Sequence, residues 1–327
     1  MKQRQLGRNG PFVSALGLGC LSFGGTFGPT TEADSLATLD AAWEAGITLL
    51  DTANRYGEGL SETVIGKWLR QTGHRPHIAT KAGFSEDPNR RIDNRAKHLR
   101  AELEGSLRRL GQDHVTLFYA HRHDPQIPAE ELAGIMQRFV EEGKTLGYGL
   151  SEIAPYTLER AHAVHPVMAV QNEYSLWTRQ PELGLIQRCA QLGVAFVPFS
   201  PLARGVFGTP IAAPERFAPG EFRARIPRFS AENWPHNRAV LEAFHDMARA
   251  RGYSPAALAL AWLLDRAPHL IPIPGTRRPD HLRAWVAASE IDLGDDDRAE
   301  IDRILPAGWA WGDRYDDVQT ATVERYS

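Results

Sequence analysis

The feature that most constrains the fold of this chain is a repeated alternation between short apolar or β-branched runs and longer amphipathic segments. In one amphipathic segment, Leu132, Met136 and Phe139 recur at the three- and four-residue spacing of a single helix face. The apolar runs have the length of strands. They occupy residues 15–19, 48–51, 77–81, 115–119, 146–151, 168–171, 195–199 and 270–274.

Strands that alternate with helices pair in parallel through right-handed crossovers. Eight such units in one chain favour a closed barrel over an open sheet, so we predict an α/β fold, a (β/α)8 TIM barrel, with residues 1–327 as one domain. The segment 2–13 predicts an N-terminal β-hairpin at the bottom of the barrel, and 295–305 predicts an extra C-terminal helix. We expect 201–236 to form a long loop over the barrel mouth and 306–327 to form a C-terminal tail.

Composition and charge exclude several classes of protein. With 37 basic and 40 acidic residues the net charge is −3, so there is no basic excess to bind nucleic acid. No stretch approaches the roughly 18 consecutive apolar residues of a membrane span, and the first residues lack the apolar core of a secretion signal. Cys20 and Cys189 are too few for a disulfide framework. We expect a cytoplasmic protein with a small-molecule partner; a homo-oligomer is compatible with the sequence, but nothing indicates one.

Polar side chains follow six of the eight runs at their carboxyl ends, where a barrel builds its active site. They are Asp51, Lys81, His121, Ser151, Gln171 and Ser200. Tyr56 follows Asp51 by five residues. A phenol has a pKa of about 10 in model peptides, and a neighbouring lysine cation stabilises the phenolate and lowers that pKa. This set therefore predicts a proton donor.

A site of this kind can reduce a carbonyl group. Tyr56 would protonate the carbonyl oxygen, Asp51 would hold the Lys81 cation in place, and His121 would orient the oxygen by a hydrogen bond. No side chain donates hydride, so a cofactor is implied. The chain has no complete G-x-G-x-x-G fingerprint and no Walker A sequence. A dinucleotide would therefore be held without a Rossmann domain.

Eight segments, in order, resemble the aldo-keto reductase family: LGLGCLSFGG, DTANRYGEGLSETVIGKWL, IATKAG, LFYAHRHDP, YGLSE, VQNEYSLW, FVPFSPLARGVF and IPIPGTRRPDHL. The resemblance spans about residues 4 to 290. Glu152 stands where many members have asparagine, a form similar to that of bacterial members, so the resemblance implies a bacterial origin. The resemblance implies a barrel that reduces aldehydes and ketones with NADPH extended across its mouth.

The same resemblance assigns residues to roles. The implied catalytic tetrad is Asp51, Tyr56, Lys81 and His121. The implied cofactor contacts run from the nicotinamide to the adenosine 2′-phosphate: Ser151 and Gln171 on the carboxamide, Phe199 against the ring, Ser200, Pro201 and Leu202 on the pyrophosphate, and Gly275, Thr276, Arg277 and Arg278 at the 2′-phosphate. The two arginines favour NADP(H) over NAD(H), because a guanidinium fork suits a phosphate. Ala284 and Trp285 replace the family's usual Glu-Asn, so the adenine contacts differ.

Two other functions fit parts of the sequence. Some relatives of the family are cofactor-sensing subunits with little turnover, although the complete tetrad argues against that function here. A metal-dependent barrel hydrolase would use His121 and His123 as an H-x-H motif. Only Asp51 is available at the other strand ends as a further ligand, so no metal is expected.

Overall fold

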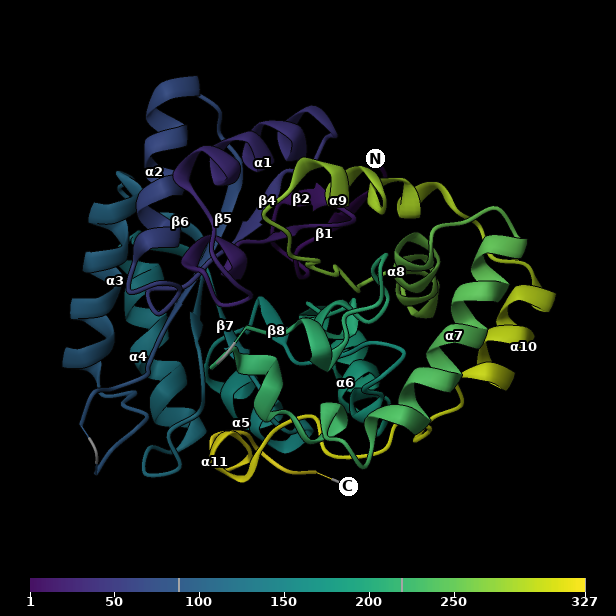
Figure 1. Cartoon of the computed structure of the whole chain (residues 1–327). Coiled ribbons are helices and arrows are strands. Elements are labelled where there is room, and N and C mark those ends of the chain that lie inside the picture. The colour runs from purple at the N-terminus through teal and green to yellow at the C-terminus, as the bar shows by residue number, and fades with distance from the viewer. Residues whose placement is uncertain (88, 219, 327) are drawn as a thin grey trace.

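A parallel sheet whose strands follow chain order forms the centre of the protein in the computed structural model, which describes residues 1–87, 89–218 and 220–326 (Figure 1). Each strand is hydrogen-bonded to the next one along the chain, as parallel crossovers require. The seven regular strands are β3 Leu18–Gly19, β4 Leu49–Asp51, β5 His77–Ala82, β6 Val115–Ala120, β7 Thr145–Ser151, β8 Ala169–Gln171 and β9 Ala195–Phe196.

The eighth apolar run closes the sheet into a cylinder. On one side, the Ile271 amide donates to the Phe196 carbonyl at 2.9 Å. On the other side, the Gly17 amide donates to the Pro272 carbonyl at 2.9 Å, and the Gly19 amide of β3 donates to the Pro274 carbonyl at 3.0 Å. Because proline has no N–H, these two residues accept but cannot donate, and the edge is not a regular ladder. The predicted (β/α)8 barrel is confirmed, with its last strand irregular.

Helices surround the barrel and follow its strands along the chain (Figure 1). The longer ones are α1 Glu32–Glu44, α2 Leu60–Thr72, α3 Ala96–Leu110, α4 Ala129–Glu141, α5 Pro155–Val164, α6 Leu185–Leu192, α7 Trp234–Ala250, α8 Pro255–Arg266 and α10 Asp295–Ile304. Two short helices, α9 Pro279–Arg283 and α11 Asp317–Thr320, complete the set. The predicted extra C-terminal helix is α10, which packs beside α7.

The N-terminal hairpin is present and lies at the bottom of the barrel. Strands β1 Gln3–Gln5 and β2 Phe12–Ser14 pair antiparallel, and Leu6 and Val13 join the apolar interior of the cylinder. Arg4 donates to three backbone carbonyls in and just after α8 at 2.6 to 2.7 Å. The carbonyls of Leu264 and Ala267 lie at the C-terminal end of α8, so the arginine both caps α8 and anchors the hairpin.

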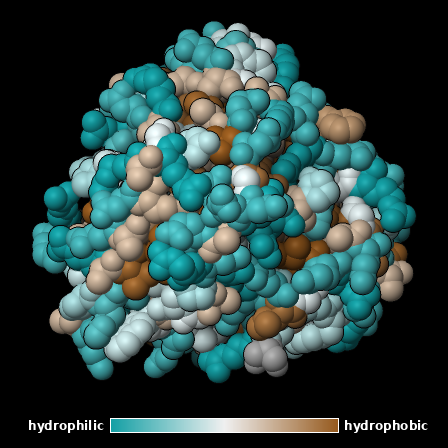
Figure 2. Space-filling model, turned by 90° about the vertical axis from the view of Figure 1, so that its right-hand side faces the viewer, coloured by the Kyte–Doolittle hydropathy of each residue, from teal (hydrophilic) through white to brown (hydrophobic). Residues whose placement is uncertain are grey.

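The surface over α7 and α10 carries mainly hydrophilic residues, and hydrophobic ones are scattered in small groups (Figure 2). Such scattered apolar residues are normal for a protein surface. Among the helices of the described residues, none has the length and apolar character needed to cross a bilayer.

Inward-facing residues alternate along the strands, and this alternation places polar groups at the top of the barrel. Leu49 and Ala79 belong to the apolar interior, and two residues further along the same strands stand Asp51 and Lys81. The same step from the interior of β8 reaches Gln171. The strand period of two therefore brings these polar side chains together at one end.

One wall of the barrel depends on a missing side chain. A Cβ on Gly149 would lie 2.3 Å from Cε1 of Tyr119 and 2.8 Å from the Ala169 carbonyl oxygen. The Tyr119 ring thus fills the space that a side chain on β7 would need. A Cβ built on Gly134 in α4, by contrast, would have no atom within 4 Å apart from its chain neighbours and the backbone of its own helix.

We expect Gly149→Ala to destabilise the protein by about 1–3 kcal/mol, because the methyl group overpacks the barrel interior. The matched change Gly134→Ala is expected to stabilise by about 0.5–1 kcal/mol through helix propensity. Urea unfolding followed by circular dichroism measures both. Equal effects of the two substitutions would contradict this account of the packing.

Candidate active site

A cavity of about 660 Å³ opens at the carboxyl ends of the strands. The predicted site residues that line it are Asp51, Tyr56, His121, Ser151, Gln171, Phe199, Ser200, Pro201, Leu202, Gly275, Thr276, Arg277 and Arg278. Lys81 does not line the cavity; it is fully buried and bonded to Asp51 and Tyr56, which do. The structure therefore brings the whole predicted set to one place, while the roles of its members remain predictions.

Lys81 is the centre of a buried hydrogen-bond network. Its ammonium donates to Asp51 Oδ1, to the Thr52 carbonyl oxygen at 2.8 Å and to Tyr56 Oη at 3.2 Å. The second oxygen of Asp51 accepts from Gln171 Nε2 at 2.8 Å. Three donors on one ammonium thus meet three acceptors, which is what a buried lysine requires.

The pKa values of this cluster reflect burial as well as charge. Burial raises the pKa of the Asp51 carboxyl. Burial alone would lower the pKa of Lys81, but the Asp51 carboxylate and the Tyr56 oxygen outweigh it and the pKa is raised. Lys81 does pull the pKa of Tyr56 down, yet burial is the larger effect and the net pKa is raised. The predicted effect of Lys81 on the Tyr56 pKa is therefore present, but burial exceeds it, and the phenol is protonated at neutral pH.

His121 lies beside this cluster as a neutral imidazole. Its ring centroid is 6.0 Å from that of Tyr56 and 4.9 Å from that of Phe84. Burial, then the cations of Arg122 and Lys81, lower its pKa well below the usual value. In the part of the chain that the structure describes, its buried Nδ1 atom has no hydrogen-bond partner. An unpartnered buried polar atom at a cavity wall is suited to a ligand.

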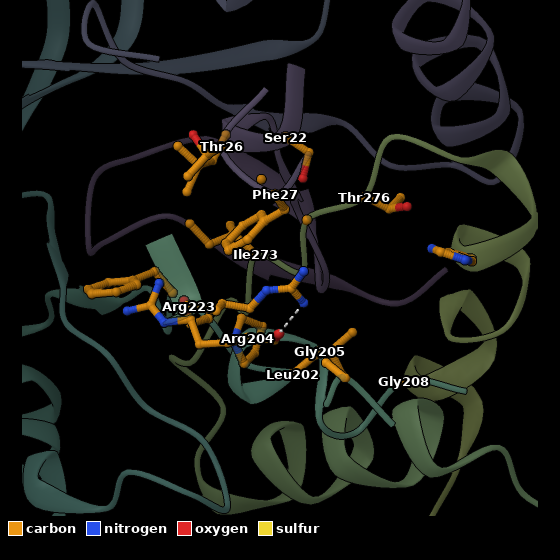
Figure 3. Close-up of a pocket in the computed structure, with 18 of the residues that line it drawn as sticks. Ser22, Thr26, Phe27, Leu202, Arg204, Gly205, Gly208, Arg223, Ile273 and Thr276 are labelled. Carbon is orange, nitrogen blue, oxygen red and sulfur yellow. Dashed lines mark hydrogen bonds between the residues drawn. The ribbon is translucent and has the colours of Figure 1, made fainter. Parts of the chain in front are cut away.

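Arginines and Phe27 line the part of the cavity away from Lys81, and Arg204 and Arg223 are among these arginines (Figure 3). Arg223 extends into it from the segment 201–236, and its Nη1 donates to the Arg204 carbonyl oxygen at 3.1 Å. The Arg223 guanidinium lies 5.3 Å from the centroid of the Phe27 ring. Arg277 Nη1 donates to the Phe27 carbonyl oxygen at 2.7 Å. Two cations from distant segments therefore meet at the loop that follows β3.

The end of the barrel at β7 and β8 holds a network of buried charges. Arg314 in the tail donates to Glu152 at 2.5 Å and to Glu173 at 3.3 Å, and Arg204 donates to Glu173 at 2.9 Å. The Arg204 guanidinium carbon lies 5.6 Å from the centroid of the Phe199 ring. Both carboxylates are almost fully buried. The network thus links the tail and the long loop to the strand ends beside Phe199.

The backbone at this end is held in an uncommon conformation. Glu152, Ser200, Ala203 and Arg204 have φ values of 56°, 49°, 49° and 60°. Residues other than glycine adopt this region at some energetic cost, and they persist there when surrounding contacts hold them. The ion pairs of Glu152 and Arg204 are such contacts. The buried Glu152 carboxylate is therefore neutralised by Arg314, a residue of the tail.

Sequence reasoning did not single out Arg122, Arg204 or Arg314. Arg122 directly follows His121, and Arg204 lies two residues after Leu202, so both were close to residues already selected. Arg314 had no local signal, because its partner Glu152 is 162 residues away. The structure also separates the H-x-H motif: His121 lines the cavity, whereas His123 bonds Glu324 Oε1 in the tail at 2.6 Å. Within the described ranges, no three His, Cys, Asp or Glu side chains gather as metal ligands.

The segments 201–236 and 306–327 both reach the cavity. Residues of the first contribute much of its lining, although α7 begins inside that range at Trp234, and the second contributes Tyr315 and Gln319. In the tail, the Glu324 amide donates to the Glu152 carbonyl oxygen at 3.0 Å, close to α5. Residues 219 and 327, which belong to these predicted segments, lie outside the described residues.

The fold and the cavity define a class: a (β/α)8 barrel with a buried lysine, carboxylate and phenol at the carboxyl ends of its strands. The sequence model of the Aldo/keto reductase family matches residues 15–306. The chain is also 38% identical over 315 residues to the probable aldo-keto reductase 1 of Glycine max, covering 95% of this chain and 91% of the relative. The chain belongs to the aldo/keto reductase family.

Two further proteins are similar to it. The aldo-keto reductase yakc of Schizosaccharomyces pombe, whose name specifies NADP(+), is 36% identical over 93% of this chain and 92% of the relative. The structure of the glycerol dehydrogenase AKR11B4 from Gluconobacter oxydans aligns with a TM-score of 0.83 at 27% identity, covering 93% of this chain and 94% of the other. Both sequence relatives come from eukaryotes, so they do not support the expected bacterial origin.

We expect Arg314→Ala to destabilise the protein by about 3–5 kcal/mol, because it leaves the buried Glu152 carboxylate without its cation. Adding Glu152→Gln should recover part of this loss by removing the uncompensated charge. Arg160→Ala is the matched control, because Arg160 pairs with Glu130 at the surface, where solvent screens an ion pair and its contribution to stability is small. Urea unfolding of the four proteins measures this, and equal losses for Arg314→Ala and Arg160→Ala would refute the buried-pair account.

Proposed function

We propose that the protein is an NADP(H)-dependent oxidoreductase that interconverts the carbonyl and alcohol groups of small aldehydes, ketones or sugars. The observation that supports this most directly is the contact of Tyr56 Oη with Lys81 Nζ at 3.2 Å, beside His121 and at the wall of the cavity. Membership of the family supports the reaction class. The names of the yeast relative and of the similar structure, with NADP(+) and dehydrogenase respectively, agree with it.

The residues of the cavity fit a nicotinamide dinucleotide. Gln171 uses its amide N–H for Asp51, which leaves its carbonyl oxygen for a carboxamide, and Ser151, its register partner on β7, lines the same cavity. Phe199 offers an aromatic face at the same end. The backbone of 200–202 and the cation of Arg277 line the part of the cavity where phosphates would bind. Bound there, the reduced cofactor supplies the hydride for the carbonyl carbon.

The protein's own residues supply the proton that the carbonyl oxygen needs. Tyr56, protonated at neutral pH, donates its proton to the carbonyl oxygen as negative charge develops on that oxygen. The Lys81 ammonium stabilises the phenolate that remains, and Asp51 holds the ammonium in place. His121, neutral because of its lowered pKa, orients the carbonyl oxygen by a hydrogen bond. The same groups act in the reverse order when an alcohol is oxidised.

The preference for NADP(H) rests on the loop 275–278. Thr276 Oγ1 accepts from the Arg278 amide at 3.0 Å, so this hydroxyl shapes the turn that presents the two arginines. Arg277 keeps guanidinium N–H groups beyond the one that bonds Phe27. Trp285, which lines the cavity where the family has asparagine, offers an aromatic surface to the adenine in place of an amide.

Tyr56→Phe is expected to lower kcat by about 10²–10⁴-fold, because the proton donor is lost. NADPH binding, measured by the change in nicotinamide fluorescence, should stay close to that of the unmodified protein. Tyr156→Phe, at an exposed position on α5, is the control. Turnover that survives in Tyr56→Phe would exclude Tyr56 as the donor. A protein that binds NADPH but reduces no aldehyde would instead favour the cofactor-sensing alternative.

Arg277→Ser is expected to raise the KM for NADPH about tenfold with little effect on the KM for NADH, because a charge-assisted hydrogen bond to the 2′-phosphate is lost. Arg283→Ser, at an exposed arginine of α9 that pairs with Asp280, controls for charge near the loop. Steady-state kinetics with both cofactors measures the change. Equal shifts for NADPH and NADH would place the 2′-phosphate elsewhere.

A further inference from the structure

A second, smaller cavity of about 320 Å³ adjoins the first. The linings of the two cavities share Arg122, Tyr315 and Gln319, so the cavities meet at these side chains. Arg55 and Arg91 also line the smaller cavity. Three arginines thus face one space, and its lining in the described ranges includes no aspartate or glutamate. This is an unusual excess of one charge in a protein with a net charge of −3.

The nearby carboxylates are already paired with other cations. Asp124 accepts from Arg90 at 2.5 and 3.0 Å, which holds this acid away from the cavity. Glu152 accepts from Arg314 at 2.5 Å. Among the described residues, Arg55 is the one arginine of this cavity that forms an ion pair, and its partner is the exposed Glu86. Such a surface pair is weak and exchanges readily with solvent or with another anion.

Arg122 has unsatisfied hydrogen-bonding capacity. Its Nη1 donates to the His121 carbonyl oxygen at 2.6 Å and approaches Ser151 Oγ at 3.5 Å. Its buried Nε has no partner among the residues that the structure describes, and neither Arg122 nor Arg91 forms a salt bridge within them. A guanidinium has five donors arranged for a carboxylate or phosphate. The Arg122 guanidinium has a single strong acceptor, the neutral carbonyl oxygen of His121.

Phe84 places these cations close to the reacting groups. Its ring centroid is 5.7 Å from the guanidinium carbons of both Arg55 and Arg122, and 4.9 Å from the centroid of the His121 ring. A backbone bridge between Phe84 and Ile92 holds the loop that carries it. The Phe84 ring therefore neighbours both the His121 imidazole and the guanidinium groups of Arg55 and Arg122.

We propose that the second cavity binds an anionic group of the carbonyl substrate, a carboxylate or a phosphate, with Arg122 as its main partner and Arg55 and Arg91 beside it. This rests on the proposed function, because the carbonyl at the other end of the same molecule must reach Tyr56 and His121. The anion satisfies the free Arg122 donors through charge-assisted hydrogen bonds, which are stronger than those between neutral groups. The proposed substrate is therefore a compound whose carbonyl group and acidic group are separated by about the width of an aromatic ring.

Matched aldehydes test the proposal. One pair is 4-carboxybenzaldehyde with its uncharged methyl ester, and the other is glyceraldehyde 3-phosphate with glyceraldehyde. We expect the unmodified protein to favour the anionic member of at least one pair in kcat/KM by about tenfold, as loss of one charged hydrogen bond would imply. The pair that shows the preference identifies the group as carboxylate or phosphate.

The variants Arg122→Gln and Arg55→Gln should each reduce that preference, the first by about tenfold to near unity and the second by less. Arg55 is half exposed, so its variant keeps the test open if Arg122→Gln fails to fold. Arg160→Gln, outside both cavities, should keep the preference of the unmodified protein.

Two results would overturn the anionic site while leaving the oxidoreductase proposal in place. One is turnover of the uncharged aldehydes with no preference for either charged member. The other is a preference that persists unchanged in both Arg122→Gln and Arg55→Gln. Absence of turnover with all four aldehydes would instead refute the oxidoreductase function itself.

Discussion

A lysine ammonium enclosed in an apolar barrel is the constraint on which the rest of this protein depends. Lys81 is fully buried, and such a charge is tolerated only when it is paired and its donors are satisfied. Asp51 and the Thr52 carbonyl, at the end of the neighbouring strand, provide that pairing, and Tyr56 completes it. Because β4 and β5 are adjacent and parallel, their register brings Asp51 and Lys81 to the same end of the barrel and assembles this buried cluster. The fold and the chemistry therefore depend on the same contacts.

The same requirement organises the charges at the barrel mouth. Glu152 and Glu173 are buried at the ends of β7 and β8, and the arginines that neutralise them come from the long loop and the tail. Each pair holds a strained or irregular segment against the rigid strands, which fixes the wall behind Phe199. The mouth is thus built from segments that are distant in the chain, and electrostatic pairing joins them.

This pairing separates the arginines of the mouth into two groups. Arg204 and Arg314 form ion pairs with the buried carboxylates of Glu173 and Glu152, and they support the cavity wall behind Phe199. Arg277 and Arg122 bond mainly to backbone oxygens and keep free donors that face cavities. We assign the first of these to the cofactor phosphate and the second to an acidic group of the substrate. On this view the protein binds anions in two adjoining cavities, with the carbonyl chemistry at Tyr56 and His121 between the two anion sites.

Local patterns in the chain were sufficient to predict the barrel, its hairpin and its last long helix, because strand and helix periods and strand-end polarity are properties of short segments. They also located Asp51, Lys81 and Gln171 at one mouth, since a period of two continues the inward face of each strand. The irregular eighth strand, the net rise in the Tyr56 pKa and the pairing of Arg314 were decided by the tertiary structure. Each depends on burial or on distances between segments far apart in the chain, and no local pattern records those quantities.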